Sequence, residues 1–184
     1  SSGYGGWGAD GQAPHLTWSS YLLAVADDPP DRRTHGWRAK LASYAAGEAA
    51  FAWGYARLRA LAVDDAPRKL IHGDLMNRNV LAGDTAITGV LDWGCACYGD
   101  HLYDLAWFDF WAPWHPNLDV AALHAALAER WRQDGYAPAN VDARLAACYL
   151  HIGLDHLAYN AWLEDWPTLD ATAARMRVLV GDLP

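Results

Sequence analysis

The sequence predicts a mostly α chain with one small β-hairpin, an α+β arrangement in which helices flank the hairpin on both sides. Two observations indicate this fold. Apolar residues recur every three to four positions through most of the chain, which is the spacing of a buried helix face. A short stretch at residues 79–93 instead reads as two strands around a tight turn. With 184 residues and no internal repeat, we expect one domain or one lobe of a larger protein.

Six helical segments are expected, and proline or glycine lies near the ends of most of them. They are residues 16–26, 36–63, 101–112, 118–133, 140–164 and 168–181. The segment 36–63 carries an apolar stripe that we expect to be buried, interrupted by Glu48. The stripe consists of Trp37, Leu41, Tyr44, Ala45, Phe51, Ala52 and Tyr55.

The hairpin is read from "NVL", the turn "AGDT" and "AITGVLDW". Because a hairpin returns the chain to its origin, the loop before its first strand and the loop after its second strand lie side by side. Asp74 and Asn79 precede the hairpin and Asp92 follows it, so we expect these three residues to converge. Carboxylate and amide oxygens are the hard ligands that Mg²⁺ prefers. The sequence therefore predicts a cation site at the base of the hairpin.

Composition and charge narrow the function. A formal net charge of −8 disfavours a nucleic-acid partner, because phosphate backbones require clustered cations, but it is compatible with a cationic small molecule. No apolar run is long enough to span a membrane, and the N-terminus does not read as a signal peptide. The three cysteines match no common zinc pattern and favour a reducing compartment. We expect a cytoplasmic protein without a membrane partner.

The polar residues around the hairpin have the spacing found in phosphoryl-transfer enzymes with a kinase-like fold. Those enzymes carry an H-x-D-x-x-x-x-N loop, whose aspartate addresses the substrate hydroxyl, and a D-x-G motif, whose aspartate holds Mg²⁺. His72, Asp74 and Asn79 fit the first motif. Asp92 and Gly94 fit the second.

Two departures from the protein-kinase pattern are informative. Gly73 stands where protein kinases commonly carry arginine, and only five residues separate Gly94 from Asp100, which leaves no room for an activation loop. These features favour a small-molecule kinase over a regulated protein kinase.

The stretch "HGDLMNRNVL…GVLDWGCACYGDHLYDLAW" resembles the aminoglycoside phosphotransferase family, whose fold is protein-kinase-like. The early "GYGGWGADGQAPHLTWSSYLLAVAD" and the later "HIGLDHLAY" are similar to the hygromycin B phosphotransferase branch of that family. The resemblance covers nearly all of residues 1–184, but only as the C-terminal helical lobe, which holds the catalytic and acceptor-binding residues. The N-terminal nucleotide lobe is expected to be absent.

The resemblance implies a role for each matching residue. Asp74 would be the catalytic residue that orients the acceptor hydroxyl and accepts its proton. Asn79 and Asp92 would ligate the Mg²⁺ bound to ATP. His72 and Asp104 would give structural support to the catalytic loop. Four acids would hold the ammonium groups of a cationic acceptor: Asp100, Asp155, Glu164 and Asp165. For Asp100 a helix cap is an open alternative, and the other three could be solvated helix faces.

The implied function is ATP-dependent O-phosphorylation of an aminoglycoside or aminocyclitol antibiotic of the hygromycin type, giving antibiotic resistance, with Mg²⁺ as cofactor. A metabolic kinase for choline, homoserine or a sugar stays open, as does a non-catalytic remnant lacking the N-terminal lobe. The segment "GYGGWG" matches G-x-G-x-x-G but lacks a strand–helix context, so we read it as a loop. Because the phosphate-covering loop and the nucleotide-gripping lysine are not found, the isolated lobe is expected to be inactive. Core packing is expected for Trp107, Trp111 and Trp114, although one of them could line a sugar-binding cleft.

Overall fold

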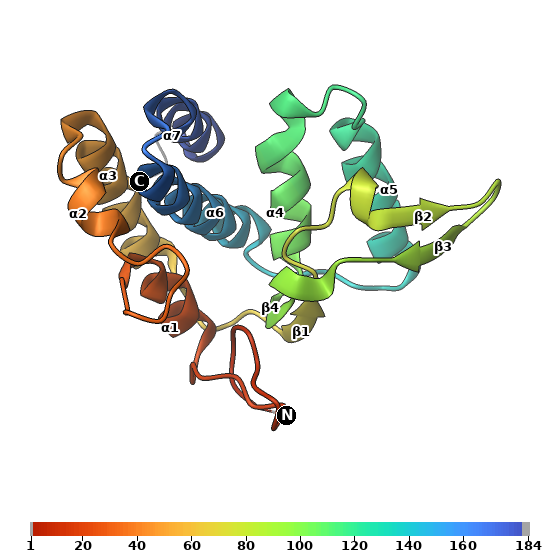
Figure 1. Cartoon of the computed structure of the whole chain (residues 1–184). Coiled ribbons are helices and arrows are strands. Elements are labelled where there is room, and N and C mark those ends of the chain that lie inside the picture. Colours follow the sequence, from red (N-terminus) through yellow and green to blue (C-terminus); the bar gives the residue numbers. More distant parts are fainter. Residues whose placement is uncertain (1, 182–184) are drawn as a thin grey trace.

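The computed structural model describes residues 2–181, except for the side chain of Asn77. Its helices are α1 (Trp18–Leu23), α2 (Trp37–Leu41), α3 (Ala45–Leu61), α4 (Leu102–Trp111), α5 (Val120–Gln133), α6 (Val141–Leu163) and α7 (Trp166–Val180). The strands are β1 (Arg68–Ile71), β2 (Val80–Ala82), β3 (Ile87–Val90) and β4 (Cys97–Asp100), and short 3₁₀ helices cover Ala24–Ala26, Asn77–Asn79, Trp93–Cys95 and Ala112–Trp114. This arrangement confirms the predicted mostly α fold class (Figure 1).

Helix α6 is the centre of the core. It packs against α2, α3, α4 and α7, between which it runs in Figure 1. Leu150, Ile152, Leu154 and Leu157 on this helix are fully buried. Each such side chain contributes roughly 1.5–3 kcal/mol through removal of its apolar surface from water. Burial of these side chains therefore fixes the position of α6 in the core, and with it the positions of the other side chains that α6 carries.

The predicted helix 36–63 is in fact two helices, α2 and α3, which are separated at residues 42–44. The Ser43 hydroxyl donates to the Lys40 carbonyl at 2.6 Å, and such side-chain bonds compete with the helical backbone. Tyr44 is extended, with φ −123° and ψ 91°. The break shifts the phase of the buried stripe, so the prediction was wrong for Ala45 and Ala52, which are exposed. The residues of α3 that are buried are Gly47, Ala50, Phe51, Gly54 and Leu58.

The strands form two separate antiparallel pairs. The pair β2–β3 is the predicted hairpin, with Val80 opposite Val90. The pair β1–β4 was not predicted; in it Ile71 lies opposite Cys97. Because β1 precedes the hairpin and β4 follows it, the second pair closes the whole segment 72–96 into one unit held at its base.

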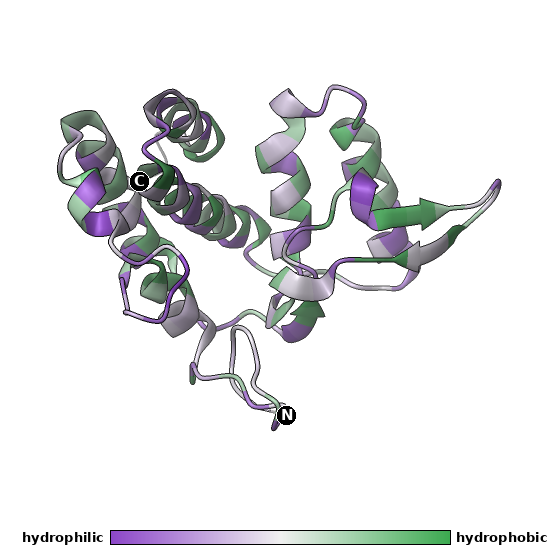
Figure 2. Ribbon diagram, in the orientation of Figure 1, coloured by the Kyte–Doolittle hydropathy of each residue, from purple (hydrophilic) through white to green (hydrophobic). Residues whose placement is uncertain are grey.

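The surface of the hairpin is apolar. Strand β2 is among the most hydrophobic elements in Figure 2, yet Leu81 is 50% exposed and Ile87 is 67% exposed. The neighbouring Leu91 and Trp93 are also about half exposed. Within residues 2–181, no helix is both long enough and apolar enough to cross a lipid bilayer.

The glycine-rich segment near the N-terminus is a loop, as predicted. Its strand-like contacts are isolated antiparallel bridges, Tyr4 with His15 and Gly5 with Tyr98. The second bridge attaches the loop to β4.

Candidate active site

The loop that follows β1 and the loop that follows β3 lie against each other. The backbone N–H of Leu91 donates to the carbonyl of Asn79 at 2.8 Å. In the other direction, His72 Nε2 lies 2.8 Å from the carbonyl oxygen of Leu91. The two loops that carry Asp74, Asn79 and Asp92 therefore lie side by side through direct contacts, with β1–β4 and β2–β3 at their ends.

His72 is buried and has one consistent protonation state. A carbonyl can only accept, so Nε2 must donate to Leu91. A backbone N–H can only donate, so Nδ1 must accept from Asp74, at 3.3 Å. Both contacts are satisfied together only by the neutral ring with its proton on Nε2. The ring also packs against Trp93, with 4.8 Å between ring centroids, and so joins the two loops.

Asp104, on the first turn of α4, holds the start of the loop that follows β1 and contains Asp74. Its two carboxylate oxygens accept from the backbone N–H of His72 at 2.9 Å and of Gly73 at 2.8 Å. Gly73 has φ +77°, and a Cβ built there would lie 2.5 Å from the carbonyl oxygen of Cys95. Glycine is required at this position because any side chain would both strain the backbone and push the two loops apart.

Asp74 and Asn79 are linked directly. The amide nitrogen of Asn79 donates to the carbonyl of Asp74 at 2.7 Å and lies 3.4 Å from its carboxylate. The amide oxygen of Asn79 is thereby the atom left for a cation. Asp74 also has Arg78 3.5 Å from its carboxylate, and its side chain is 21% exposed.

Asp92 has a strained backbone. It lies in the left-handed region, with φ 59° and ψ 62°, although it is not glycine. Aspartate tolerates this region better than most residues, and such strain costs about 1–3 kcal/mol and clusters at functional sites. Asp92 lies two residues after the end of β3, and its side chain is exposed at the start of the loop that follows this strand.

The oxygen atoms of Asn79 and Asp92 are of the type that Mg²⁺ prefers. In the described part of the chain, no group of three or more His, Cys, Asp or Glu residues is placed to hold a metal ion. Mg²⁺ commonly uses only one or two protein carboxylates and takes its remaining ligands from phosphates and water. Asn79 and Asp92 are the residues that could supply such oxygen atoms from this part of the chain.

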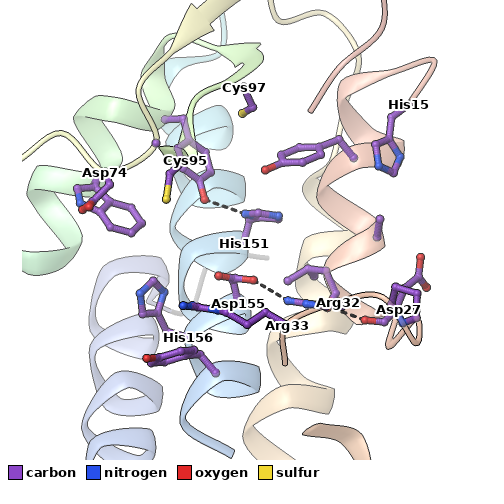
Figure 3. A pocket seen from close by; sticks show the side chains of 18 of the residues that line it. His15, Asp27, Arg32, Arg33, Asp74, Cys95, Cys97, His151, Asp155 and His156 are labelled. Carbon is purple, nitrogen blue, oxygen red and sulfur yellow. Dashed lines mark hydrogen bonds and ion pairs between the residues drawn. The ribbon is translucent and has the colours of Figure 1, made fainter. Parts of the chain in front are cut away.

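A cavity of about 830 Å³ opens beside Asp74. Figure 3 shows that its lining side chains belong to the loop that contains Asp74, to α6 and to the segment between α1 and α2, among other parts of the chain. Its charged and histidine lining residues are His15, Asp27, Asp31, Arg32, Arg33, Asp74, Arg78, His151, Asp155 and His156. Trp107 also lines it, although core packing was expected for the tryptophan series and a place in a cleft was only the alternative.

The wall of the cavity includes a buried tyrosine–histidine pair. The hydroxyl of Tyr103 lies 2.9 Å from His151 Nδ1. Burial lowers the pKa of His151 to about 4, which outweighs the opposite effect of the nearby Asp155 carboxylate. His151 is therefore neutral at physiological pH. Burial also raises the pKa of the Cys97 thiol to about 12, so this cavity residue is protonated.

The four predicted acceptor acids fall in different environments. Asp155 lines the cavity and pairs with Arg32 at 2.8 Å. Glu164 pairs with Lys40 at 2.9 Å at the end of α6, and Asp165 caps the N-terminus of α7 through Thr168, so the structure does not bring these two to the cavity.

Asp100 requires a correction. Its side chain is 0% exposed, and its two carboxylate oxygens lie 2.6 and 2.8 Å from the guanidinium of Arg144 on α6. One of these oxygens also accepts from the backbone N–H of Leu102, a cap-like contact at the start of α4. A carboxylate with no accessible surface and a paired cation cannot hold an acceptor, so Asp100 is a structural residue.

The sequence reading missed the contribution of the segment between α1 and α2. No functional residue was predicted in its run "DDPPDRR", yet Asp27, Asp31, Arg32 and Arg33 from this run line the cavity. The available signal was the density of charge in a short loop, which is more than a helix terminator needs.

Residues 13–143 match the model of the phosphotransferase enzyme family. The chain belongs to that family. It is 30% identical over 159 residues to the hygromycin-B 4-O-kinase of Escherichia coli, covering 85% of this chain and 42% of that protein.

Solved structures of the aminoglycoside phosphotransferase APH(4)-Ia have the same fold. A ternary complex of a thermostable mutant with AMP-PNP and hygromycin B matches with a TM-score of 0.74 at 30% identity, over 97% of this chain and 57% of that one. A complex with ADP and hygromycin B matches with a TM-score of 0.75 at 29% identity, over 100% and 59% of the two chains. The chain thus spans about half the length of its relatives, and it has the helical lobe of the kinase-like fold.

Proposed function

We propose that this chain is the catalytic and acceptor-binding lobe of an ATP- and Mg²⁺-dependent phosphotransferase that acts on a hydroxyl of a hygromycin-type aminocyclitol antibiotic and so gives resistance to it. The observation that carries the proposal is the position of Asp74. Its carboxylate lies in the catalytic loop and lines a cavity large enough for a small molecule. The relatives, one of them named as a hygromycin-B kinase and others solved with hygromycin B and an adenine nucleotide, support the choice of substrates.

The chemistry assigned to the chain is positioning and proton transfer. Asp74 receives the acceptor hydroxyl from the cavity, orients its oxygen toward the γ-phosphorus and accepts its proton as the new P–O bond forms and the bond to ADP breaks. Asn79 braces Asp74 through its amide nitrogen and offers its oxygen to the cation. Asp92 offers a second oxygen. Bound Mg²⁺ supplies neutralisation of the charge on the nucleotide phosphates.

A second lobe is part of the proposal. It would carry the loop and the lysine that grip the nucleotide in kinase-like enzymes. The exposed apolar side chains of the hairpin region support this, since exposed apolar surface is typical of an interface; they are Leu81, Ile87, Leu91 and Trp93. We expect the 184-residue chain alone to lack appreciable kinase activity.

An acceptor screen tests the function. The enzyme carrying both lobes is assayed for ATP-dependent phosphorylation of hygromycin B, kanamycin, choline and homoserine, and hygromycin B is expected to have the highest kcat/KM. If choline or homoserine is the best acceptor, the antibiotic assignment fails while the kinase mechanism stands. If none of the four is phosphorylated, the antibiotic assignment fails, and a sugar kinase or a non-catalytic protein remains.

Two substitutions test the assigned residues. Asp74→Asn should lower kcat by at least about 100-fold, since general-base catalysis contributes that much, while leaving ATP affinity nearly unchanged. Asp92→Asn should instead weaken Mg·ATP binding and change its metal dependence. Asp84→Asn, at the exposed tip of the hairpin, is the control and should change neither quantity.

A further inference from the structure

Asp155 already carries a cation supplied by the chain itself. In Figure 3 the side chain of Arg32 reaches from the segment between α1 and α2 to Asp155 on α6, and its Nη2 lies 2.8 Å from the carboxylate. Both residues line the cavity that holds Asp74. A guanidinium on a cavity carboxylate occupies the place that an ammonium group of a bound cation would take.

The pair is easily exchanged. The side chain of Arg32 is 22% exposed and that of Asp155 is 46% exposed, so water reaches the contact and limits its strength. Arg32 also has a second set of partners, because its Nη1 donates to the carbonyls of Asp27 at 2.9 Å and of Val25 at 3.4 Å. When Arg32 leaves Asp155, its guanidinium keeps acceptors and is not left without hydrogen bonds.

The backbone of the segment has supports that do not involve the contact between Arg32 and Asp155. The carboxylate of Asp28 accepts from the backbone N–H of Gly36 at 3.0 and 3.1 Å and of Arg38 at 3.4 Å. Arg38 in turn donates through Nε to the carbonyl of Ala26 at 2.6 Å. Displacement of Arg32 therefore requires a side-chain rotation and no refolding of the loop.

The neighbouring Arg33 provides a contrast. It lines the same cavity, but its guanidinium lies over the ring of Tyr159, 5.2 Å from the centroid. Arg33 contributes the same charge to the cavity from the adjacent position, and it contacts an aromatic ring where Arg32 contacts a carboxylate.

We propose that Asp155 forms an ammonium subsite of the acceptor cavity, that Arg32 occupies this subsite in the free protein, and that a cationic acceptor binds by displacing Arg32. Arg32 is then a specificity-determining residue. An acceptor with an ammonium group at the correct distance from its reactive hydroxyl replaces the guanidinium, whereas a neutral alcohol leaves the pair closed and gains nothing from Asp155. The identity of the acceptor as a hygromycin-type aminocyclitol rests on the proposed function.

Calorimetric binding of hygromycin B to the protein tests the displacement without requiring catalysis. Arg32→Gln removes the competing charge and should tighten hygromycin B binding about threefold to fivefold, the range expected for an exposed ion pair. Arg33→Gln, the matched control, should change the affinity less than twofold. Asp155→Asn should weaken binding, and Arg32→Gln added to Asp155→Asn should bring no further gain. With hygromycin B whose amino groups are acetylated, Arg32→Gln should have no effect.

Each other outcome contradicts the proposal. Unchanged or weaker binding after Arg32→Gln would show that Arg32 does not compete with the acceptor. An equal gain from Arg33→Gln, or a gain that persists with Asp155→Asn or with the acetylated compound, would indicate only a general effect of charge. The proposed function fails separately, if the binding pattern is as expected but the two-lobed enzyme does not phosphorylate hygromycin B.

Discussion

Asp104 holds the backbone of His72, although 32 positions separate the two residues. One carboxylate oxygen accepts from His72 N–H at 2.9 Å, and the other accepts from the next residue, Gly73, at 2.8 Å. The first turn of α4 therefore fixes the point at which β1 ends and the loop that contains Asp74 begins. The orientation of Asp74 depends on this contact, because Asp74 is the next residue in the chain.

Replacing Asp104 tests this dependence. Asp104→Asn substitutes an NH₂ group for one acceptor, and the loss should reduce the free energy of unfolding by about 2 kcal/mol and lower kcat. Denaturant unfolding and turnover of the two-lobed enzyme are the measurements. Asp109→Asn, on the same helix, replaces one of the two oxygens that contact Tyr149 and His124 and serves as the control. It should reduce stability without a comparable loss of kcat; equal losses of kcat would mean that Asp104 acts only through stability.

Gly73→Ala tests the approach of the two loops. The new Cβ would lie 2.5 Å from the carbonyl oxygen of Cys95 in a left-handed backbone, so the loops must move apart. A misplacement of catalytic groups by about 1 Å can cost about 100-fold in rate, so kcat should fall by about that factor. Gly83→Ala in the hairpin is the matched control, because its Cβ would meet Thr88 at an ordinary 3.5 Å. Near wild-type turnover of Gly73→Ala would refute the requirement for glycine.

The buried pair of Asp100 and Arg144 should matter for folding and not for acceptor binding. Asp100→Asn leaves the Arg144 charge without its partner and should cost about 3–5 kcal/mol in the free energy of unfolding. The KM for the acceptor should stay within about twofold. Asp134→Asn breaks the exposed pair with Arg130 and should cost about 1 kcal/mol or less. A large rise in KM with unchanged stability would restore Asp100 to the acceptor site.

The depressed pKa of His151 predicts a loss of stability in acid. The folded protein disfavours the protonated ring down to a pKa of about 4, whereas the unfolded chain protonates its histidine near the ordinary pKa of about 6.5. Above that value both states are neutral and the residue contributes no pH dependence. As the pH falls from about 6.5 to about 4, only the unfolded state gains the proton, and stability falls by about 2 kcal/mol at pH 5.

Urea unfolding of the chain at pH 7.5 and pH 5 measures this effect. The decrease contributed by His151 should disappear in His151→Gln, which cannot titrate but can still bond Tyr103. An identical decrease in the wild type and the variant would assign the pH dependence to other groups.

Local features of the site and the fold follow from the sequence. The order of helices, the β2–β3 hairpin and the contact between the loops on either side of it depend on periodicity and on spacing over some twenty residues, which the chain displays directly. The prediction that Asp104 supports the loop came from the family pattern; the structure supplies its contacts, the backbone N–H groups of two consecutive residues.

Tertiary structure alone decided the rest, because it depends on which distant side chains meet. The pair β1–β4 joins short strands with no turn between them, so no local pattern marks it. Arg32 meets Asp155 across 123 positions, and Arg144 meets Asp100 across 44. The sequence does not distinguish an aspartate that is buried and paired with an arginine from one that caps a helix or faces a cavity. Packing of α6 against the rest of the core places Asp155 at the cavity. It also places Arg144 of the same helix against Asp100, which is buried away from the cavity.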